Sequence, residues 1–329
     1  MFGICDRLVL RTVDGAADLL IEELRSLPSV HSIRQVSGVE VACTVDGWLG
    51  ELAGCALYST VAIALPGRSG DCGFLRPLEW SSDSGVLKTL GPRIGFRVGT
   101  EDPAVRQALI AAVEHRLGWV NRPGEWDVNL TCTADGWIAE IGPLSWMRRF
   151  GPLERLPWST TPVVAEVLVR LAKVRAGQRV VDPFCGTGTI LLAVRRREPT
   201  SRVVGTDHDP RALAIATRNS GRSIDLAQAT AEALPFPAGS VDRIITNLPF
   251  GKQVGSHRAN RTLYPAVLSE IDRVLAADGR AVLLTEDKRL LRSAIEQQRA
   301  LKVARHRLLR YNGATPTAHV LTRPHRRTP

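Results

Sequence analysis

The chain has 329 residues, which is long for one typical domain, so we expect two or three domains that each bury a core. Hydrophobic residues make up 44% and charged residues 23%, which excludes a largely disordered chain. The formal net charge of +10 favours an anionic partner such as nucleic acid.

The cysteines and the apolar segments exclude several classes of protein. The six cysteines are dispersed without a C-x-x-C pair, so we expect no metal site and no disulfide framework. Asp6 and Arg7 interrupt the apolar N-terminus before a signal-peptide core forms, and no apolar run approaches the ~20 residues of a membrane span. We therefore expect a cytoplasmic protein without a membrane partner; its oligomeric state stays open, with a monomer favoured.

The first half of the chain predicts two small α+β modules. Residues 7–13 suit a strand, residues 15–27 have helical spacing, and residues 32–45 suit two strands, which together give a β-α-β-β module over 1–70 that ends in a Pro- and Gly-rich cluster at 66–70. A second module is expected over 71–145. It contains a strand at 94–100, a helix at 103–117 capped by Asp102, and a hairpin at 128–142 with Asp135-Gly136 at its turn.

The second half predicts an α/β domain. Residues 146–158 lack a sustained period and are expected to form a linker. From residue 159 to 329 a helix at 162–174 is followed by apolar strands that alternate with helical stretches, at 178–184, 201–207, 241–247 and 280–286. This alternation predicts a doubly wound parallel sheet.

A glycine-rich turn follows the first of these strands. Gly186 and Gly188 stand between strand and helix, where glycine lets the backbone approach a ligand. No Lys-Ser or Lys-Thr follows, which disfavours a nucleoside triphosphate, and Leu191 stands where a dinucleotide motif has its third glycine. By itself the turn is equally compatible with a structural role.

An acidic residue ends the next strand. Asp207 comes about 20 residues after the turn, where a carboxylate accepts both ribose hydroxyls of a nucleoside cofactor. The alternative role, a helix N-cap, suits Asp209 better because Asp209-Pro210 opens the following helix. The glycine-rich turn and Asp207 together indicate a nucleoside-containing cofactor.

The segment Asn247-Leu248-Pro249-Phe250 ends the fourth strand of this domain and resembles the [DNS]-P-P-[FYW] signature of amino-methyltransferases. An aryl amine is a poor nucleophile while its lone pair is delocalised into the ring. The Asn247 side-chain oxygen and the Leu248 carbonyl can accept the two amine hydrogens, and Phe250 can stack on a base turned out of its helix.

Residues 159–290 are similar to the guanine-N2 tRNA methyltransferases that carry an N-terminal THUMP domain. The matching segments are DPFCGTGT, LPFPAGSVD, NLPFGKQVGSHRANRTLYP and AVLLTEDK. The first half resembles the N-terminal ferredoxin-like and THUMP modules of that family. The resemblance implies a class I domain with S-adenosylmethionine as cofactor and a tRNA substrate, modified on guanine N2 in the acceptor stem at the sixth nucleotide.

The resemblance also implies site residues. Target binding is carried onto Asn247, Leu248, Pro249 and Phe250. Many relatives have an acidic residue where this chain has Thr230, so adenine recognition there differs in detail. The expected cofactor-binding residues are Asp182, Phe184, Gly186, Thr187, Gly188, Thr189, Asp207, His208, Thr230, Ala231 and Asn247.

Basic residues after the target-base motif are candidates for contacts to RNA. These are Lys252, His257, Arg258 and Arg261, each of which is equally compatible with a solvated charged surface. Two other functions stay open. The same Asn-x-Pro-Phe chemistry serves an rRNA or DNA amino-methyltransferase, acting on guanine N2 or adenine N6, and a catalytically silent RNA-binding protein is the alternative outside enzymes.

Overall fold

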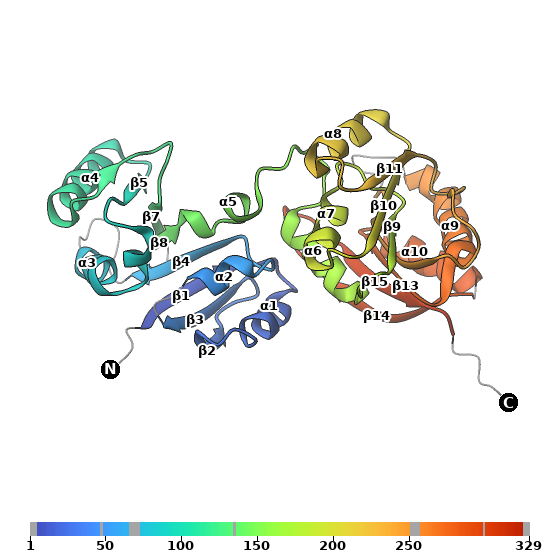
Figure 1. Ribbon diagram of the computed structural model, residues 1–329, viewed down its shortest axis with the longest axis horizontal. Helices are drawn as coiled ribbons and strands as arrows, with labels where there is room; N and C mark the ends of the chain where they lie inside the picture. The colour runs from blue at the N-terminus through green and yellow to red at the C-terminus, as the bar shows by residue number, and fades with distance from the viewer. Residues whose placement is uncertain are drawn as a thin grey trace. The chain divides into compact units, whose positions relative to one another are not determined.

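Figure 1 shows a computed structural model of the chain, which describes residues 5–46, 49–65, 73–133, 136–250, 257–298 and 300–324. The chain forms two compact units, Met1–Pro152 and Leu153–Pro329, and each contains its own β-sheet. In these ranges no helix combines the length and the hydropathy that crossing a membrane requires.

The first unit is built on an eight-stranded sheet with the order β2-β3-β1-β4-β8-β7-β5-β6. Neighbouring strands are antiparallel, except that β5 runs parallel to β6 and β7. The strands are β1 (Cys5–Arg11), β2 (Val30–Gln35), β3 (Glu40–Asp46), β4 (Thr60–Leu65), β5 (Gly95–Gly99), β6 (Val120–Asn121), β7 (Val128–Thr133) and β8 (Gly136–Ile141). The helices are α1 (Ala17–Leu24), α2 (Gly50–Gly54), α3 (Leu75–Ser84), η1 (Val86–Leu90), α4 (Pro103–Leu117), η2 (Gly142–Leu144) and α5 (Trp146–Phe150).

Local sequence signals are confirmed in this unit. The apolar spacing of α1 buries Leu19, Leu20 and Leu24 on one side of the helix. The Asp102 side chain caps α4 by accepting hydrogen bonds from the backbone N–H groups of Ala104 at 2.8 Å and Val105 at 3.2 Å. The expected hairpin forms between β7 and β8, whereas its turn residue Asp135 and the cluster 66–70 lie outside the described residues.

The two modules expected in the first half share one sheet. Antiparallel pairing of β4 with β8 joins strands from either side of residue 70. Strands from both sides of the division at residue 70 therefore belong to one hydrogen-bonded sheet, and two separate modules stay a prediction. The segment 146–158, expected as a linker, begins with the short helix α5.

The second unit contains a seven-stranded sheet with the order β11-β10-β9-β12-β13-β15-β14. The first five strands in that order are parallel, which confirms the doubly wound arrangement, and the antiparallel strands β15 and β14 extend it. The strands are β9 (Arg179–Asp182), β10 (Arg202–Asp207), β11 (Asp225–Gln228), β12 (Val241–Asn247), β13 (Leu275–Thr285), β14 (Lys302–Leu308) and β15 (Thr317–Thr322). The helices are α6 (Pro162–Ala172), α7 (Thr189–Arg197), α8 (Pro210–Ser220), α9 (His257–Val274) and α10 (Lys288–Gln298).

The strand order creates a crevice at the carboxyl edge of this sheet. From β9 the chain moves outward to β10 and β11 and then returns to β12 on the other side of β9. Figure 1 shows α6, α7 and α8 on one side of these strands and α9 and α10 on the other. Buried residues such as Val181, Ile244 and Leu283 form the core beneath α9 and α10. Open α/β sheets bind ligands at such a switch point, so a ligand site is expected at the ends of β9, β10 and β12.

Candidate active site

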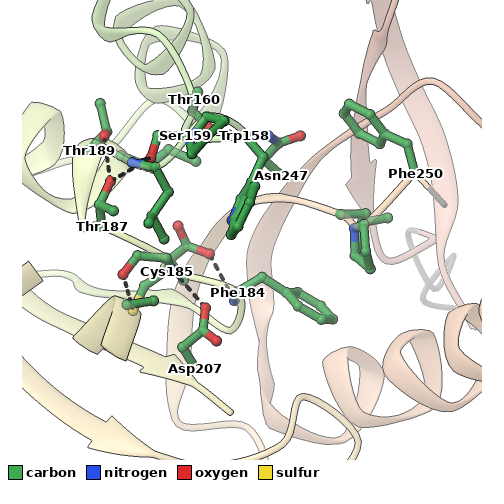
Figure 2. A pocket seen from close by; sticks show the side chains of 18 of the residues that line it. Trp158, Ser159, Thr160, Phe184, Cys185, Thr187, Thr189, Asp207, Asn247 and Phe250 are labelled. Atoms are coloured by element: carbon green, nitrogen blue, oxygen red, sulfur yellow. Dashed lines mark hydrogen bonds between the residues drawn. The ribbon is translucent and has the colours of Figure 1, made fainter. Parts of the chain in front are cut away.

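A cavity of about 420 Å³ lies at the carboxyl edge of the second sheet. Figure 2 shows Asp207 and Phe250 on opposite sides of the view, with Asn247 between them. Six segments form most of the wall, and Ala212 of α8 completes it. The segments are 156–160 before α6, the turn from Asp182 to Ile190, the end of β10 at 207–209, the end of β12 at 247–250, Glu286 after β13, and the connection 311–314 between β14 and β15.

The glycine-rich turn brings backbone to the cavity. Gly186 has φ +51 and open space at the position of a Cβ, so its conformation and not its size favours glycine. Gly188 has φ +82 and packs against α8, where a Cβ would lie 3.3 Å from the Ala216 Cβ atom. The turn can therefore approach a ligand closely at Gly186, while Gly188 packs against Ala216 of α8.

Asp207 lies at the end of β10 with 8% of its surface exposed. Its Oδ2 atom accepts a hydrogen bond from the Gly186 backbone N–H at 2.8 Å, and Oδ1 accepts one from the Asp209 N–H at 3.0 Å. His208 Nδ1 also lies 3.3 Å from Oδ1, whereas Oδ2 accepts the bond from Gly186 and has a second lone pair for a ligand donor. This arrangement suits a pair of ribose hydroxyls.

Asp182 is a buried carboxyl group at the end of β9. Its Oδ1 atom accepts a hydrogen bond from the Phe184 N–H at 3.1 Å, whereas Oδ2 has no hydrogen-bond partner among the described residues. Burial raises the pKa of Asp182 to about 7, and the nearby Asp207 adds to the rise, while the Phe184 N–H and the Thr246 hydroxyl oppose it. A cationic ligand group beside Oδ2 would relieve the cost of this buried charge.

Asn247 ends β12 with its side-chain amide in a fixed hydrogen bond. Its Nδ2 atom donates to Thr160 Oγ1 at 3.0 Å. Its Oδ1 atom is buried and has no partner among the described residues. A buried acceptor without a partner is unfavourable unless a ligand supplies the donor. The site therefore contains a hydrogen-bond acceptor at the position expected to hold an amine.

Residues Leu248 and Pro249 are held by neighbouring elements. The Leu248 N–H donates to the Leu284 carbonyl of β13 at 2.9 Å. The Pro249 carbonyl accepts hydrogen bonds from Asn260 Nδ2 at 2.8 Å and from the Tyr264 hydroxyl at 2.9 Å, both from α9. These contacts fix the backbone of the Asn-Leu-Pro-Phe segment, and Phe250 lines the cavity at its end.

Residues 156–160 form a wall of the cavity, although sequence analysis assigned most of this segment to a linker. Ser159 Oγ lies 3.0 Å from Thr187 Oγ1, which joins this segment to the glycine-rich turn. Asn219 of α8 donates from Nδ2 to the carbonyls of Thr187 and Glu154, both at 2.9 Å. These bonds hold Trp158 at the cavity with 45% of its surface exposed.

The connection between β14 and β15 also lines the cavity and was not expected. Asn312 has φ +50 and Gly313 has φ +72, and Tyr311 and Ala314 exchange backbone hydrogen bonds of 3.1 and 2.9 Å. Two successive positive φ values define the two-residue hairpin turn that Asn-Gly favours. The Asn-Gly pair after a basic strand was the signal that could have revealed this hairpin.

Some of the expected site residues lie elsewhere. Gly188 is buried behind the turn, Thr230 is exposed, Ala231 is buried in the core, and none of the three lines the cavity. Arg258 and Arg261 are exposed on α9. Lys252 and the side chain of His257 lie outside the described residues. The expected residues that do line the cavity are Asp182, Phe184, Gly186, Thr187, Thr189, Asp207, His208, Asn247, Leu248, Pro249 and Phe250.

The fold and the site together define a class I methyltransferase that uses S-adenosylmethionine. Residues 159–315 match the family described as UPF0020: RMKL-like, methyltransferase domain. The matched residues cover most of the second unit and slightly less than half of the chain.

Three similar proteins extend this finding. The tRNA (guanine(6)-N2)-methyltransferase of Thermus thermophilus is 40% identical over 184 residues, covering 54% of this chain and 53% of that protein. The tRNA (guanine(6)-N(2))-methyltransferase THUMP3 of Bos taurus is 35% identical over 156 residues, covering 42% of this chain and 31% of that protein. The crystal structure of TrmN from Thermus thermophilus superimposes with a TM-score of 0.75 at 29% identity, covering 97% of this chain and 99% of that chain. The chain thus spans about half the length of the first relative and about a third of the second.

Proposed function

We propose that the chain is a tRNA guanine-N2 methyltransferase that modifies a guanosine of the acceptor stem, at position 6. The observation that carries the proposal is the buried Oδ1 atom of Asn247 at the cavity, which has no hydrogen-bond partner among the described residues. An amine hydrogen is the donor that this atom lacks. The activities named for the Thermus and Bos taurus relatives support guanine N2 and position 6.

The residues at the end of β12 hold the amine. Asn247 Oδ1 and the Leu248 carbonyl accept its two hydrogens, which localises the lone pair on nitrogen and directs it at the methyl group. S-adenosylmethionine, when bound, supplies an electrophilic methyl group on a sulfonium. As the nitrogen–carbon bond formed, the sulfur–methyl bond would break and leave its electron pair on the sulfur as a neutral thioether, and the cationic nitrogen would then release one proton to water. Phe250 stacks on the target base outside its helix.

The residues present fit the cofactor. Asp207 would hold the ribose hydroxyls, and the turn at Gly186 would allow close approach of backbone. Asp182, whose buried Oδ2 atom has no hydrogen-bond partner among the described residues, would hold a cationic group, for which the methionine ammonium is the candidate. Thr230, expected near the adenine, is exposed and outside the cavity, so adenine contacts are assigned to other lining residues.

The first unit is assigned to gripping the tRNA through ferredoxin-like and THUMP-type modules. Arg97 and Arg148 both lie over the ring of Trp126, with guanidinium carbons 4.3 and 5.0 Å from its centroid. Arginine and an aromatic ring on one surface suit phosphates and exposed bases. This arrangement supports RNA as the partner of the first unit.

The proposal is tested by transfer of a labelled methyl group to unmodified tRNA, to rRNA and to DNA in separate reactions, each followed by digestion to nucleosides. N2-methylguanosine from the acceptor stem is the expected product. Label in N6-methyladenosine, label only in rRNA or DNA, or no label in any nucleic acid would contradict it. The last result would favour the silent RNA-binding alternative.

A further inference from the structure

We infer that Glu286 selects guanine over other purines by accepting a hydrogen bond from N1–H of the target base. This inference rests on the proposed function. Glu286 belongs to the segment AVLLTEDK, and the methyl-transfer steps described above assign no role to its side chain.

The sheet register places Glu286 beside the target-base segment. β12 and β13 are parallel, with Asn247 opposite Leu284, so the two positions that follow in each chain bring Pro249 and Glu286 to the same edge. The Tyr264 hydroxyl joins the two strand ends, because it contacts the Pro249 carbonyl at 2.9 Å and Thr285 Oγ1 at 2.8 Å. Glu286 therefore lines the cavity next to the segment that holds the amine.

Glu286 differs in position from the other carboxylates of the cavity. Asp182 is the last residue of β9, and Asp207 and Asp209 belong to the end of β10 and the loop after it, on the side assigned to the cofactor. Among the acidic lining residues of the described chain, Glu286 alone directly follows β13, which lies beyond β12 in the strand order. Its position thus matches the base and not the ribose.

The hairpin after β14 holds this carboxylate in place. The backbone N–H of Thr315 donates to Glu286 Oε1 at 3.3 Å. Tyr311 lies close by. Burial is the largest cause that raises the pKa of the Tyr311 hydroxyl to about 12; the Glu286 charge adds to this rise, whereas Arg155 lowers the pKa. Glu286 is half-buried, so its charge acts in a region with limited water. A carboxylate held in this way is oriented before the base arrives.

The hydrogen-bonding groups of guanine explain why a carboxylate would select this base. Guanine presents N1–H directly beside its N2 amine, so a base held by its amine also brings a second donor that needs an acceptor. A carboxylate makes a charge-assisted hydrogen bond to this donor. Adenine and 2-aminopurine carry a lone pair at N1, which a carboxylate repels.

The test compares two tRNAs that carry either guanosine or 2-aminopurine at the modified position. 2-Aminopurine keeps the amine but has an acceptor at N1, so only the N1 contact and the O6 atom differ. Wild-type enzyme should methylate the guanosine tRNA with the higher kcat/KM. Glu286→Gln should reduce this preference by roughly 10–100-fold, because the amide of Gln can donate to N1 of 2-aminopurine. The binding constant of S-adenosylmethionine should not change.

Controls separate this role from a structural one. Glu296→Gln, on the exposed part of α10, should leave the preference unchanged. If Glu286→Gln does not fold, Glu286→Ala takes its place in the test, because it introduces no larger side chain. Glu286→Ala should also reduce the preference for guanosine over 2-aminopurine. An unchanged preference in either folded variant, or weaker cofactor binding with an unchanged preference, overturns the inference while wild type still forms N2-methylguanosine. Absence of N2-methylguanosine with wild type overturns the proposed function itself.

Discussion

Asn247 Nδ2 donates a hydrogen bond to Thr160 Oγ1 at 3.0 Å, and within the described part of the chain no donor reaches Asn247 Oδ1. Thr160 is 9% exposed and follows Ser159, which is bonded to the glycine-rich turn through Thr187. The orientation of the amide at the end of β12 is therefore set by residues that precede α6.

Replacing Thr160 by Val should lower kcat with little effect on cofactor affinity. The change keeps the size of the side chain but leaves the buried Asn247 Nδ2 without its acceptor, which costs about 1–3 kcal/mol and lets the amide rotate. We expect kcat to fall on the order of 10-fold or more. Thr160→Ser, which keeps the hydroxyl, should retain activity. Steady-state kinetics with all three proteins measures the effect, and equal kcat values would show that Thr160 does not orient the amide.

Replacing Asp207 by Ala should weaken binding of S-adenosylmethionine. The carboxylate is assigned to both ribose hydroxyls, and hydrogen bonds to a charged group contribute about 1.5–3 kcal/mol. Isothermal titration calorimetry measures the loss. Asp225→Ala, at the exposed start of β11, serves as a matched control with unchanged affinity. Wild-type affinity in folded Asp207→Ala would remove this residue from the cofactor site.

The free energy of unfolding should fall as pH rises from 4 to 7 because of Asp182. Burial raises the pKa of Asp182 to about 7 from an ordinary value of 3.8, so between these values the folded state binds the proton that the unfolded state has released. The folded state is thus favoured at low pH, and this contribution is lost as pH passes through the folded pKa. Asp182→Asn should flatten the dependence by on the order of 2–4 kcal/mol. Urea unfolding at several pH values measures it, and parallel curves for the two proteins would contradict the assignment.

Arg97 and Arg148 should contribute to tRNA binding without affecting the cofactor. Replacing both by Ala removes two cations from the Trp126 ring, so the slope of log affinity against log salt concentration should fall by about 1–2. The control is Arg116→Ala, since Arg116 is paired with Glu79 at 2.7 Å in the same unit. Filter binding over a range of salt concentrations compares them. Equal slopes for the double variant and wild type would assign the tRNA grip to other residues.

Much of the fold follows from local pattern. Each apolar strand predicted in the second half exists, and Asn247 ends the fourth strand of that unit as expected. Apolar runs that alternate with helices have one favourable arrangement, which is a parallel sheet covered on both faces. The sequence pattern alone therefore predicts that the carboxyl ends of these strands lie at a common edge.

Other parts of the site depend on contacts between distant residues. Segment 154–160 has no period of its own and is ordered by bonds to Thr187 and Asn219, which lie 28 and 65 residues away from Ser159 and Glu154. Six of the seven residues of β14 are exposed, so its place in the sheet comes from pairing with β15 and not from burial. Such elements carry little signal in the sequence, because tertiary pairing and not side-chain periodicity determines them.

The central claim is that Asn247 Oδ1 holds the amine as the methyl group is transferred. Asn247→Ala removes this acceptor together with the bond to Thr160, and loss of one oriented partner in the transition state lowers kcat by roughly 10²–10³. Single-turnover methylation with saturating cofactor and tRNA isolates the chemical step from binding. We predict a chemical rate lower by that factor with unchanged affinity for S-adenosylmethionine. A folded Asn247→Ala enzyme that methylates tRNA at the wild-type rate would contradict the account.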